Sequence, residues 1–174
     1  MVQRLVAGSA SARGLIKTVS VLATLALAAA IDLAVPFVPQ EKDTCGAAAL
    51  AMVLGYWGRP MPHAEIASAL AEPELRGIRG TRLATFARER GFYALAYEGD
   101  LAQLRDYVSK GRPLIVAWRV GRDRFHDVVV VGFDEGVVVV HDPAEGAARR
   151  LAARVFEKRW AGASHWTLLV MPAP

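Results

Sequence analysis

The chain has 174 residues, 53% of them hydrophobic, which is enough apolar material to fill the core of one domain. The net charge of +4 is uneven, because residues 1–30 hold three basic residues and no acidic one, leaving 18 basic against 17 acidic residues, or +1, in 31–174. A body this close to neutral lacks the basic footprint of nucleic-acid-binding proteins, so no nucleic-acid partner is expected.

The first 30 residues have the layout of an export signal. Arg4, Arg13 and Lys17 precede an uncharged apolar run at 18–30, which ends in three alanines that offer a small-residue cleavage site. The run is short for a membrane-spanning helix, which needs ~20 apolar residues. We therefore expect an exported protein, periplasmic or secreted.

Two other interpretations of this leader stay open. A retained anchor would give membrane association through the N-terminal segment, and a cytosolic amphipathic start is the third possibility. On any of them, residues 1–30 are a leader and 31–174 form the folded domain.

The next segment leads into a helix that is apolar on nearly every side. Residues 35–40 are predicted to be extended, because a residue that precedes a proline is excluded from the helical region. A helix then begins at Cys45 and stops at Gly58, before Arg59-Pro60. A helix without a polar face belongs in the middle of a domain.

Cys45 is the only cysteine, so it cannot form an internal disulfide. An unpaired cysteine in an exported protein is either a small core residue or a reactive one. Unpaired backbone N–H groups and the positive dipole end at a helix N-terminus both stabilise a thiolate. The position of Cys45 is thus suited to a nucleophile, although the residue alone does not decide between a core role and a reactive one.

Hydrophobic spacing predicts the rest of the chain. A helix at 62–70 begins with Pro62, and His63 is interpreted as a solvated residue of its first turn. A polar loop at 72–80 leads to a helix at 81–90 capped by Thr81. The remaining elements are a strand at 92–97, a helix capped by Asp100 and ending at Lys110, strands at 113–118, 126–133 and 137–141, a short helix at 153–160 and a strand at 166–171.

The continuous valine runs at 126–133 and 137–141 indicate a hairpin buried on both faces. The order of the elements, helices first and then an antiparallel sheet, predicts an α+β domain.

A reactive thiol needs a base, and the base needs a group that orients it. His126 opens one strand of the hairpin and Asp142 closes the other, so pairing around the turn would bring them to the same end of the sheet. His141 and Asp127 form a rival pair, because adjacent strand residues point to opposite faces. The residues leave this choice open.

Gln40 is either a polar loop residue or, together with the Cys45 backbone N–H, an oxyanion donor. One cysteine and scattered histidines make no metal-ligand set, so no metal and no cofactor are expected.

The run from Gln40 to Gly58 resembles the start of the bacteriocin-processing, double-glycine-leader cysteine peptidases of family 39, which are papain-like. The later order agrees: Gly91-Phe92, the strand at 113–116, His126 opening a valine strand, Asp142-Pro143, and a closing helix and strand. The similarity extends from about residue 35 to residue 171. Gln40 lies one residue closer to Cys45 than in many papain-like enzymes, and the chain resembles the stand-alone members of the family.

The resemblance implies a papain-like fold with N-terminal helices packed on a C-terminal antiparallel sheet. It also implies Cys45 as nucleophile, His126 as base, Asp142 as its orienter and Gln40 in the oxyanion hole. The expected function is hydrolysis of peptide bonds in a peptide or protein substrate. A non-cleaving peptide-binding or maturation module on the same fold and a transglutaminase-like acyl transfer are the alternatives.

Overall fold

The computed structural model describes residues 30–70, 72, 77–122 and 124–173. The predicted leader lies outside these residues apart from Ala30, as does part of the predicted loop at 72–80. Within the described residues, no helix combines the length and the apolarity that crossing a membrane requires.

The central helix, α1 (Cys45–Tyr56), begins at the predicted residue, and its positions 46–54 are all buried. It is surrounded on every side, which explains why its sequence has no polar stripe. Its N-cap, Thr44, does not cap the helix through its side chain. The Thr44 hydroxyl instead bonds to the backbone of Glu41 at 3.0 Å and so closes the turn that leads into the helix.

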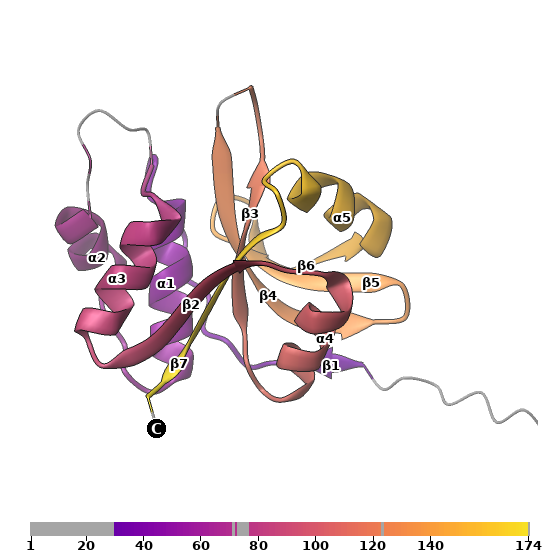
Figure 1. Ribbon diagram of the computed structural model, residues 1–174, viewed down its shortest axis with the longest axis horizontal. Coiled ribbons are helices and arrows are strands. Elements are labelled where there is room, and N and C mark those ends of the chain that lie inside the picture. The colour runs from indigo at the N-terminus through magenta and orange to yellow at the C-terminus, as the bar shows by residue number, and fades with distance from the viewer. Residues whose placement is uncertain (1–29, 71, 73–76, 123, 174) are drawn as a thin grey trace, which may run out of the picture.

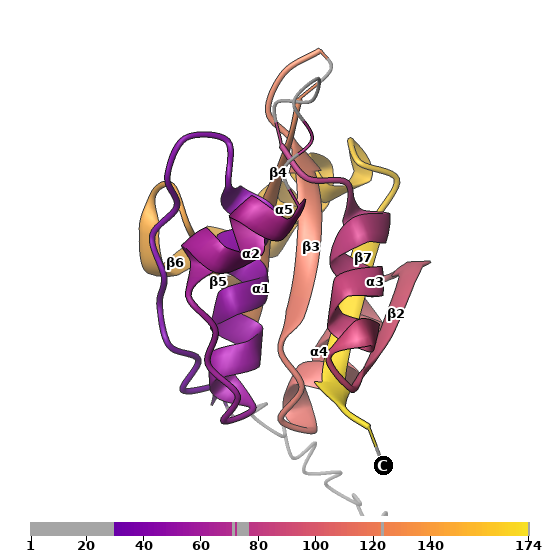
Figure 2. The same cartoon turned by 90° about the vertical axis from the view of Figure 1, so that its left-hand side faces the viewer.

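Two further helices, α2 (His63–Leu70) and α3 (Gly80–Glu89), pack with α1 (Figure 2). The helix α2 begins one residue after the predicted Pro62, and His63 is half-buried. The prediction that Thr81 caps α3 was wrong, because the N-cap is Arg79 and the helix starts at Gly80. Packing sets this start, since a Cβ on Gly80 would overlap the indole of Trp166.

The strands form one antiparallel sheet in the order β2-β7-β3-β4-β5-β6, with β1 pairing beside β4 (Figure 1). Their bounds are β1 (Ile31–Asp32), β2 (Phe92–Glu98), β3 (Leu114–Arg119), β4 (Phe125–Asp134), β5 (Val137–Asp142), β6 (Gly146–Ala152) and β7 (Trp166–Pro172). The sequence did not predict β1 or β6. The short β1 has only two residues, and β6 is a largely exposed edge strand without the alternation that marks a half-buried strand.

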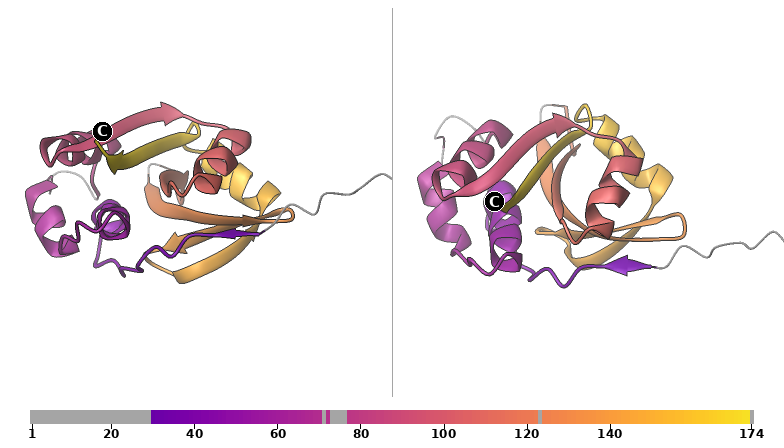
Figure 3. Two further views of the ribbon diagram at one scale, coloured as in Figure 1. Left: turned by 90° about the horizontal axis from the view of Figure 1, so that it is seen from below. Right: turned by 60° about the horizontal axis from the view of Figure 1, so that its bottom comes forward.

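The two faces of the sheet carry separate cores. Helices α1, α2 and α3 cover one face, and α4 (Leu101–Ser109) and α5 (Ala153–Ala161) cover the other (Figures 1 and 3). In β4, Val129 and Val131 belong to the first core, whereas Val128 and Val130 belong to the second. The predicted α+β order and the hairpin buried on both faces are thereby confirmed.

A glycine in β4 lets the N-terminal strand β1 pair closely with the sheet. The β4–β5 register shifts between Val130 and Gly132, and β1 pairs at the same place, with Asp32 opposite Gly132. A Cβ on Gly132 would collide with the backbone oxygen of Ile31. Only glycine therefore allows β1 to approach so closely.

We expect Gly132→Ala to lower the free energy of unfolding by about 1–3 kcal/mol, because the added methyl must displace backbone. Urea denaturation followed by circular dichroism would measure the loss. Gly121→Ala is the matched control, since its Cβ would meet nothing closer than the Cβ of Arg124 at 3.7 Å. Equal stability of the two variants would contradict the close approach of β1.

Candidate active site

The four predicted site residues come from four places in the fold. Cys45 is the first residue of α1, His126 the second residue of β4 and Asp142 the last residue of β5, while Gln40 lies in the extended segment before α1. The antiparallel pairing of β4 with β5 brings His126 and Asp142 to the same end of the sheet, as the hairpin predicted.

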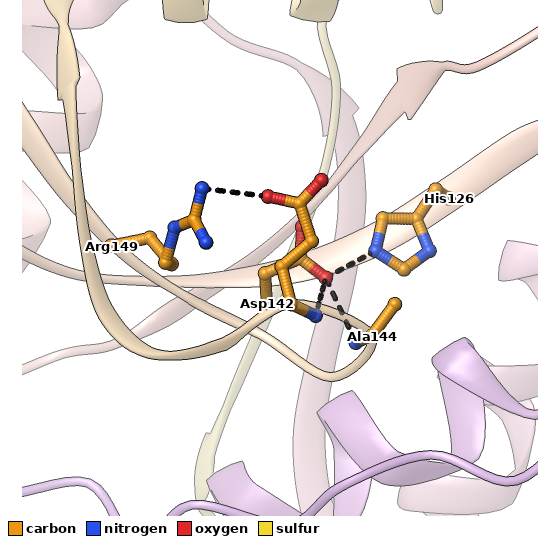
Figure 4. Close-up of polar contacts among 5 residues, drawn as sticks. His126, Asp142, Ala144 and Arg149 are labelled. Carbon is orange, nitrogen blue, oxygen red and sulfur yellow. Dashed lines mark hydrogen bonds and ion pairs between the residues drawn. The ribbon is translucent and has the colours of Figure 1, made fainter.

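His126 and Asp142 are joined directly. The His126 Nε2 lies 2.7 Å from Oδ1 of Asp142, and the two side chains are only 12% and 3% exposed (Figure 4). A short contact between groups so shielded from water is a strong, charge-assisted hydrogen bond. It leaves Nδ1 as the ring nitrogen that can face a thiol.

The loop after β5 holds the Asp142 carboxylate in place. Its Oδ1 accepts hydrogen bonds from the backbone N–H of Ala144 at 2.9 Å and of Glu145 at 3.3 Å (Figure 4). Burial raises the pKa of Asp142, but the His126 hydrogen bond and charge and these two N–H groups outweigh it and hold the pKa below its ordinary value. The carboxylate is therefore kept charged beside the imidazole.

The electrostatics of His126 favour the imidazolium. Burial lowers the pKa of its ring, but the hydrogen bonds with Asp142 and with the Cys45 thiol, and the charges of both, raise it to about 10. Cys45 itself is half-buried and free of any disulfide. The Asp142 carboxylate and the Cys45 thiol thus both favour the charged form of the same imidazole.

Gln40 is tied to the same loop. Its backbone N–H donates to the carbonyl oxygen of Pro143 at 3.0 Å. Its side chain lines a surface hollow of about 410 Å³, which His126 and Asp142 line as well. The structure therefore brings Gln40 to the same hollow as His126 and Asp142.

The rival histidine has a structural place. The ring of His141 lies between two backbone groups, with Nε2 2.9 Å from the Val35 oxygen and Nδ1 accepting from the Ala148 N–H at 3.1 Å. Both ring nitrogens are used, which fixes one neutral tautomer with Nε2 as the donor. His141 therefore anchors the segment before α1 to β5, and it is His126 that faces an acid.

Asp127 faces the first turn of α1. A Cβ on Gly46 would lie 2.8 Å from Oδ2 of Asp127, so this carboxyl packs directly against the helix start. It is 8% exposed, and burial raises its pKa to about 7, although the charge of His126 opposes the rise. A carboxyl group that lies beside the cysteine helix thus titrates near neutrality.

Sequence reasoning missed two contributors to the site. The turn that orients Asp142 could have been anticipated, because an Asp followed by proline and small residues is typical of an Asx-turn. Trp118, whose ring centroid lies 6.0 Å from that of His126, gave no such signal. It faces His126 only because β3 pairs with β4 in a register that sets the two opposite each other.

We expect Asp127→Asn to change the pH dependence of stability. The pKa of Asp127 is ordinarily 3.8 and rises to about 7 in the fold, so the folded chain holds an extra proton between these values. Wild-type stability should therefore fall relative to the variant, by about 2 kcal/mol or more, as pH rises from 4 to 7.

Urea unfolding at several pH values between 4 and 7 would test this. Asp134→Asn is the control, because a backbone hydrogen bond from Glu135 and the contact with Arg150 lower the pKa of Asp134. Its contribution to stability is lost only as pH falls below the ordinary pKa, so the curve of this variant should stay parallel to that of the wild type between pH 4 and 7. Parallel curves for wild type and Asp127→Asn would contradict the assignment.

Comparison with known proteins gives matches in sequence and in structure. The chain is 31% identical over 135 residues to the transport/processing ATP-binding protein ComA of Streptococcus pneumoniae strain R6, covering 77% of this chain and 18% of that protein. It thus spans less than a fifth of the curated relative.

Two solved structures share the fold. The peptidase domain of Streptococcus ComA, a bifunctional ABC transporter involved in quorum sensing, matches with a TM-score of 0.68 at 25% identity, over 78% of this chain and 97% of that one. A double-glycine-motif protease from an AMS/PCAT transporter, in complex with its leader peptide, matches with a TM-score of 0.66 at 26% identity, over 82% and 94%.

The predicted papain-like arrangement of helices and antiparallel sheet is confirmed by these structures. A family model described as the peptidase C39-like family matches residues 32–167, which is most of the chain. The chain therefore belongs to the peptidase C39-like family.

Proposed function

We propose that this protein is an exported thiol peptidase that hydrolyses peptide bonds with Cys45, His126 and Asp142. One observation carries the proposal: the His126 ring bonds to Asp142 at 2.7 Å. The Cys45 thiol adds to it, because it helps to raise the pKa of the same ring. A nucleophile, its base and the group that orients the base are what acyl transfer through a thiol requires.

The first step is attack on the substrate. The Cys45 Sγ, as a thiolate beside the His126 imidazolium, forms a bond to the carbonyl carbon of the peptide. The carbonyl oxygen gains negative charge, which the unpaired Cys45 backbone N–H at the start of α1 and the Gln40 amide stabilise. The dipole of α1 points its positive end at the same place.

The second step breaks the peptide bond. His126 gives its proton to the departing amine as the C–N bond breaks, leaving a thioester on Cys45. His126 then takes a proton from water as the water oxygen attacks the thioester, and the C–S bond breaks to release the acid and restore the Cys45 thiolate beside the His126 imidazolium. Asp142 keeps the imidazole oriented through both transfers.

A peptide substrate is supported by the relatives. One of the matching structures was obtained in complex with a leader peptide, so the shared fold can accommodate a peptide. The relative named for transport and processing is far longer than this chain, which covers 18% of it, so its transport function is not carried over to this chain. Export rests on the leader sequence at 1–30, and intact mass of the secreted protein would show whether that leader is removed.

We expect Cys45→Ala to lower the rate of peptide hydrolysis at least about 10³-fold, because the covalent step is lost. Mass spectrometry of a peptide library would measure it, and circular dichroism would check the fold. A thiol-reactive probe should label Cys45 in the wild type, and labelling should drop in His126→Ala.

The alternatives predict other results. If the thiol-reactive probe does not label Cys45 and the peptide library is not cleaved, a peptide-binding module is favoured. Products joined to an added amine, in place of hydrolysis products, would favour acyl transfer.

We expect hydrolysis to persist at alkaline pH. The His126 pKa of about 10 keeps the proton that the leaving amine needs, and kcat/KM should fall as pH rises through this value. Asp142 raises that pKa, so Asp142→Asn should move the fall to lower pH. The pH profile of kcat/KM for both proteins is the measurement, and an unmoved alkaline limb would contradict the role of Asp142.

A further inference from the structure

The hollow beside the catalytic pair is lined by basic side chains. It measures about 410 Å³ and begins at Gln40, His126 and Asp142. Arg119, Arg124 and Arg159 line the same hollow.

A second hollow of about 660 Å³ continues along the same surface. It shares Arg119 and Arg159 with the first and adds Arg154 and Lys158. The two hollows form one basic groove, defined by Arg119, Arg124, Arg154, Lys158 and Arg159, that leads from His126 along α5. Residues 31–174 carry a net charge of only +1, so this local excess stands out.

The acidic side chains at the groove are occupied elsewhere. Asp142 is bound to His126, Glu145 pairs with Arg149 at 2.9 Å (Figure 4), and Glu157 of α5 pairs with His165 at 2.7 Å. Among the described residues, no carboxylate forms an ion pair with any of the five basic groups. The positive charge is therefore available to a ligand.

Two of the arginines are held in position. The Arg159 Cζ lies 5.2 Å from the centroid of Trp118, the ring that contacts His126, and the Arg119 Cζ lies 5.6 Å from the centroid of Phe125. The stem of Arg119 also packs on Gly162, where an added Cβ would come within 3.0 Å of the Arg119 Cβ. Guanidinium groups ordered in this way lose little freedom when they bind a carboxylate.

The position of the groove relative to His126 indicates which part of a peptide it meets. His126 protonates the departing amine, so the residues C-terminal to the cleaved bond leave past the imidazole. The groove starts at His126 and Gln40 and is not lined by Cys45. This step rests on the proposed peptidase function.

We propose that the basic groove binds a carboxylate in the part of a peptide substrate that is C-terminal to the cleaved bond. The bidentate fork of arginine matches a carboxylate, and Val120 and Val155, 52% and 37% exposed, add apolar contact between the charges. The carboxylate is an Asp or Glu side chain or the peptide's own C-terminus.

Binding is measured first without cleavage, on the full chain carrying Cys45→Ala. The probes are mixtures of fluorescein-labelled decapeptides in which one position of the C-terminal half is fixed as Glu or as Gln. Each mixture is made once with a free C-terminus and once with an amidated one. Fluorescence anisotropy should show that the Glu peptides, the peptides with a free C-terminus, or both bind about fivefold or more tightly than the amidated Gln peptides. This difference in affinity should disappear in high salt. The free and amidated ends separate the two carboxylate sources.

Variants then assign the preference. Arg119→Gln with Arg159→Gln should abolish it, and Arg119→Lys with Arg159→Lys should retain part of it, because the charge remains. The matched control is Arg59→Gln with Arg112→Gln, whose guanidinium groups also lie over rings, Phe92 and Tyr107, away from the groove. Equal affinity of the wild-type groove for all the peptides, or loss of the preference in the control alone, would overturn the proposal.

Cleavage separates this inference from the proposed function. With Cys45 intact, acidic residues should be enriched after the cleaved bond. The Arg119→Gln, Arg159→Gln variant should lose this enrichment, whereas the Arg59→Gln, Arg112→Gln control should keep it. Absence of cleavage in every protein would refute the peptidase, yet the anisotropy result would still decide carboxylate binding. Binding to anionic lipid vesicles with no peptide preference would assign the groove to a membrane surface and overturn the proposal.

Discussion

The antiparallel pairing of β4 with β5 is the interaction on which the site depends. Val129 lies opposite His141, so β4 starts and β5 finishes at the same end of the sheet. Side chains alternate along each strand, which puts His126 and Asp142 on one face. A slip of one residue would turn a whole strand over and bring different side chains together. The valines between these ends, buried on both faces, make such a slip costly.

The site forms where the two cores meet at the end of the sheet. Cys45 arrives on α1, which packs in one core, whereas Trp118, beside His126, belongs to the other. Burial of α1 on all sides fixes where its N-terminus lies, and Gly46 lets the helix start approach β4. The second core also carries α5, whose Arg159 lies over Trp118. The proposed groove and the His126 imidazole thereby share one layer of the fold.

Much of the fold could be predicted because its signals are local. The apolar helix after Cys45, the valine hairpin and the Asp100 cap, whose carboxylate accepts from the Gln103 N–H at 2.9 Å, each depend on neighbours in sequence. The exposed edge strand β6 was missed because it carries no alternation. The start of α3 was misplaced because contact of Gly80 with Trp166, far away in the chain, overrides local capping.

The sequence by itself determined which chemical groups are present and where they stand in their elements: a lone thiol at a helix start, an imidazole and a carboxyl group at strand ends. Only the tertiary structure decided which histidine meets which acid. That choice depends on the strand register and on the face of the sheet to which each side chain points. The ring nitrogens of His141 bond to backbone groups of Val35 and Ala148, so His141 does not pair with an acid. The position of Asp127 against Gly46 was likewise set by packing, because a contact between a strand and a helix 80 residues earlier leaves no periodic trace in the chain.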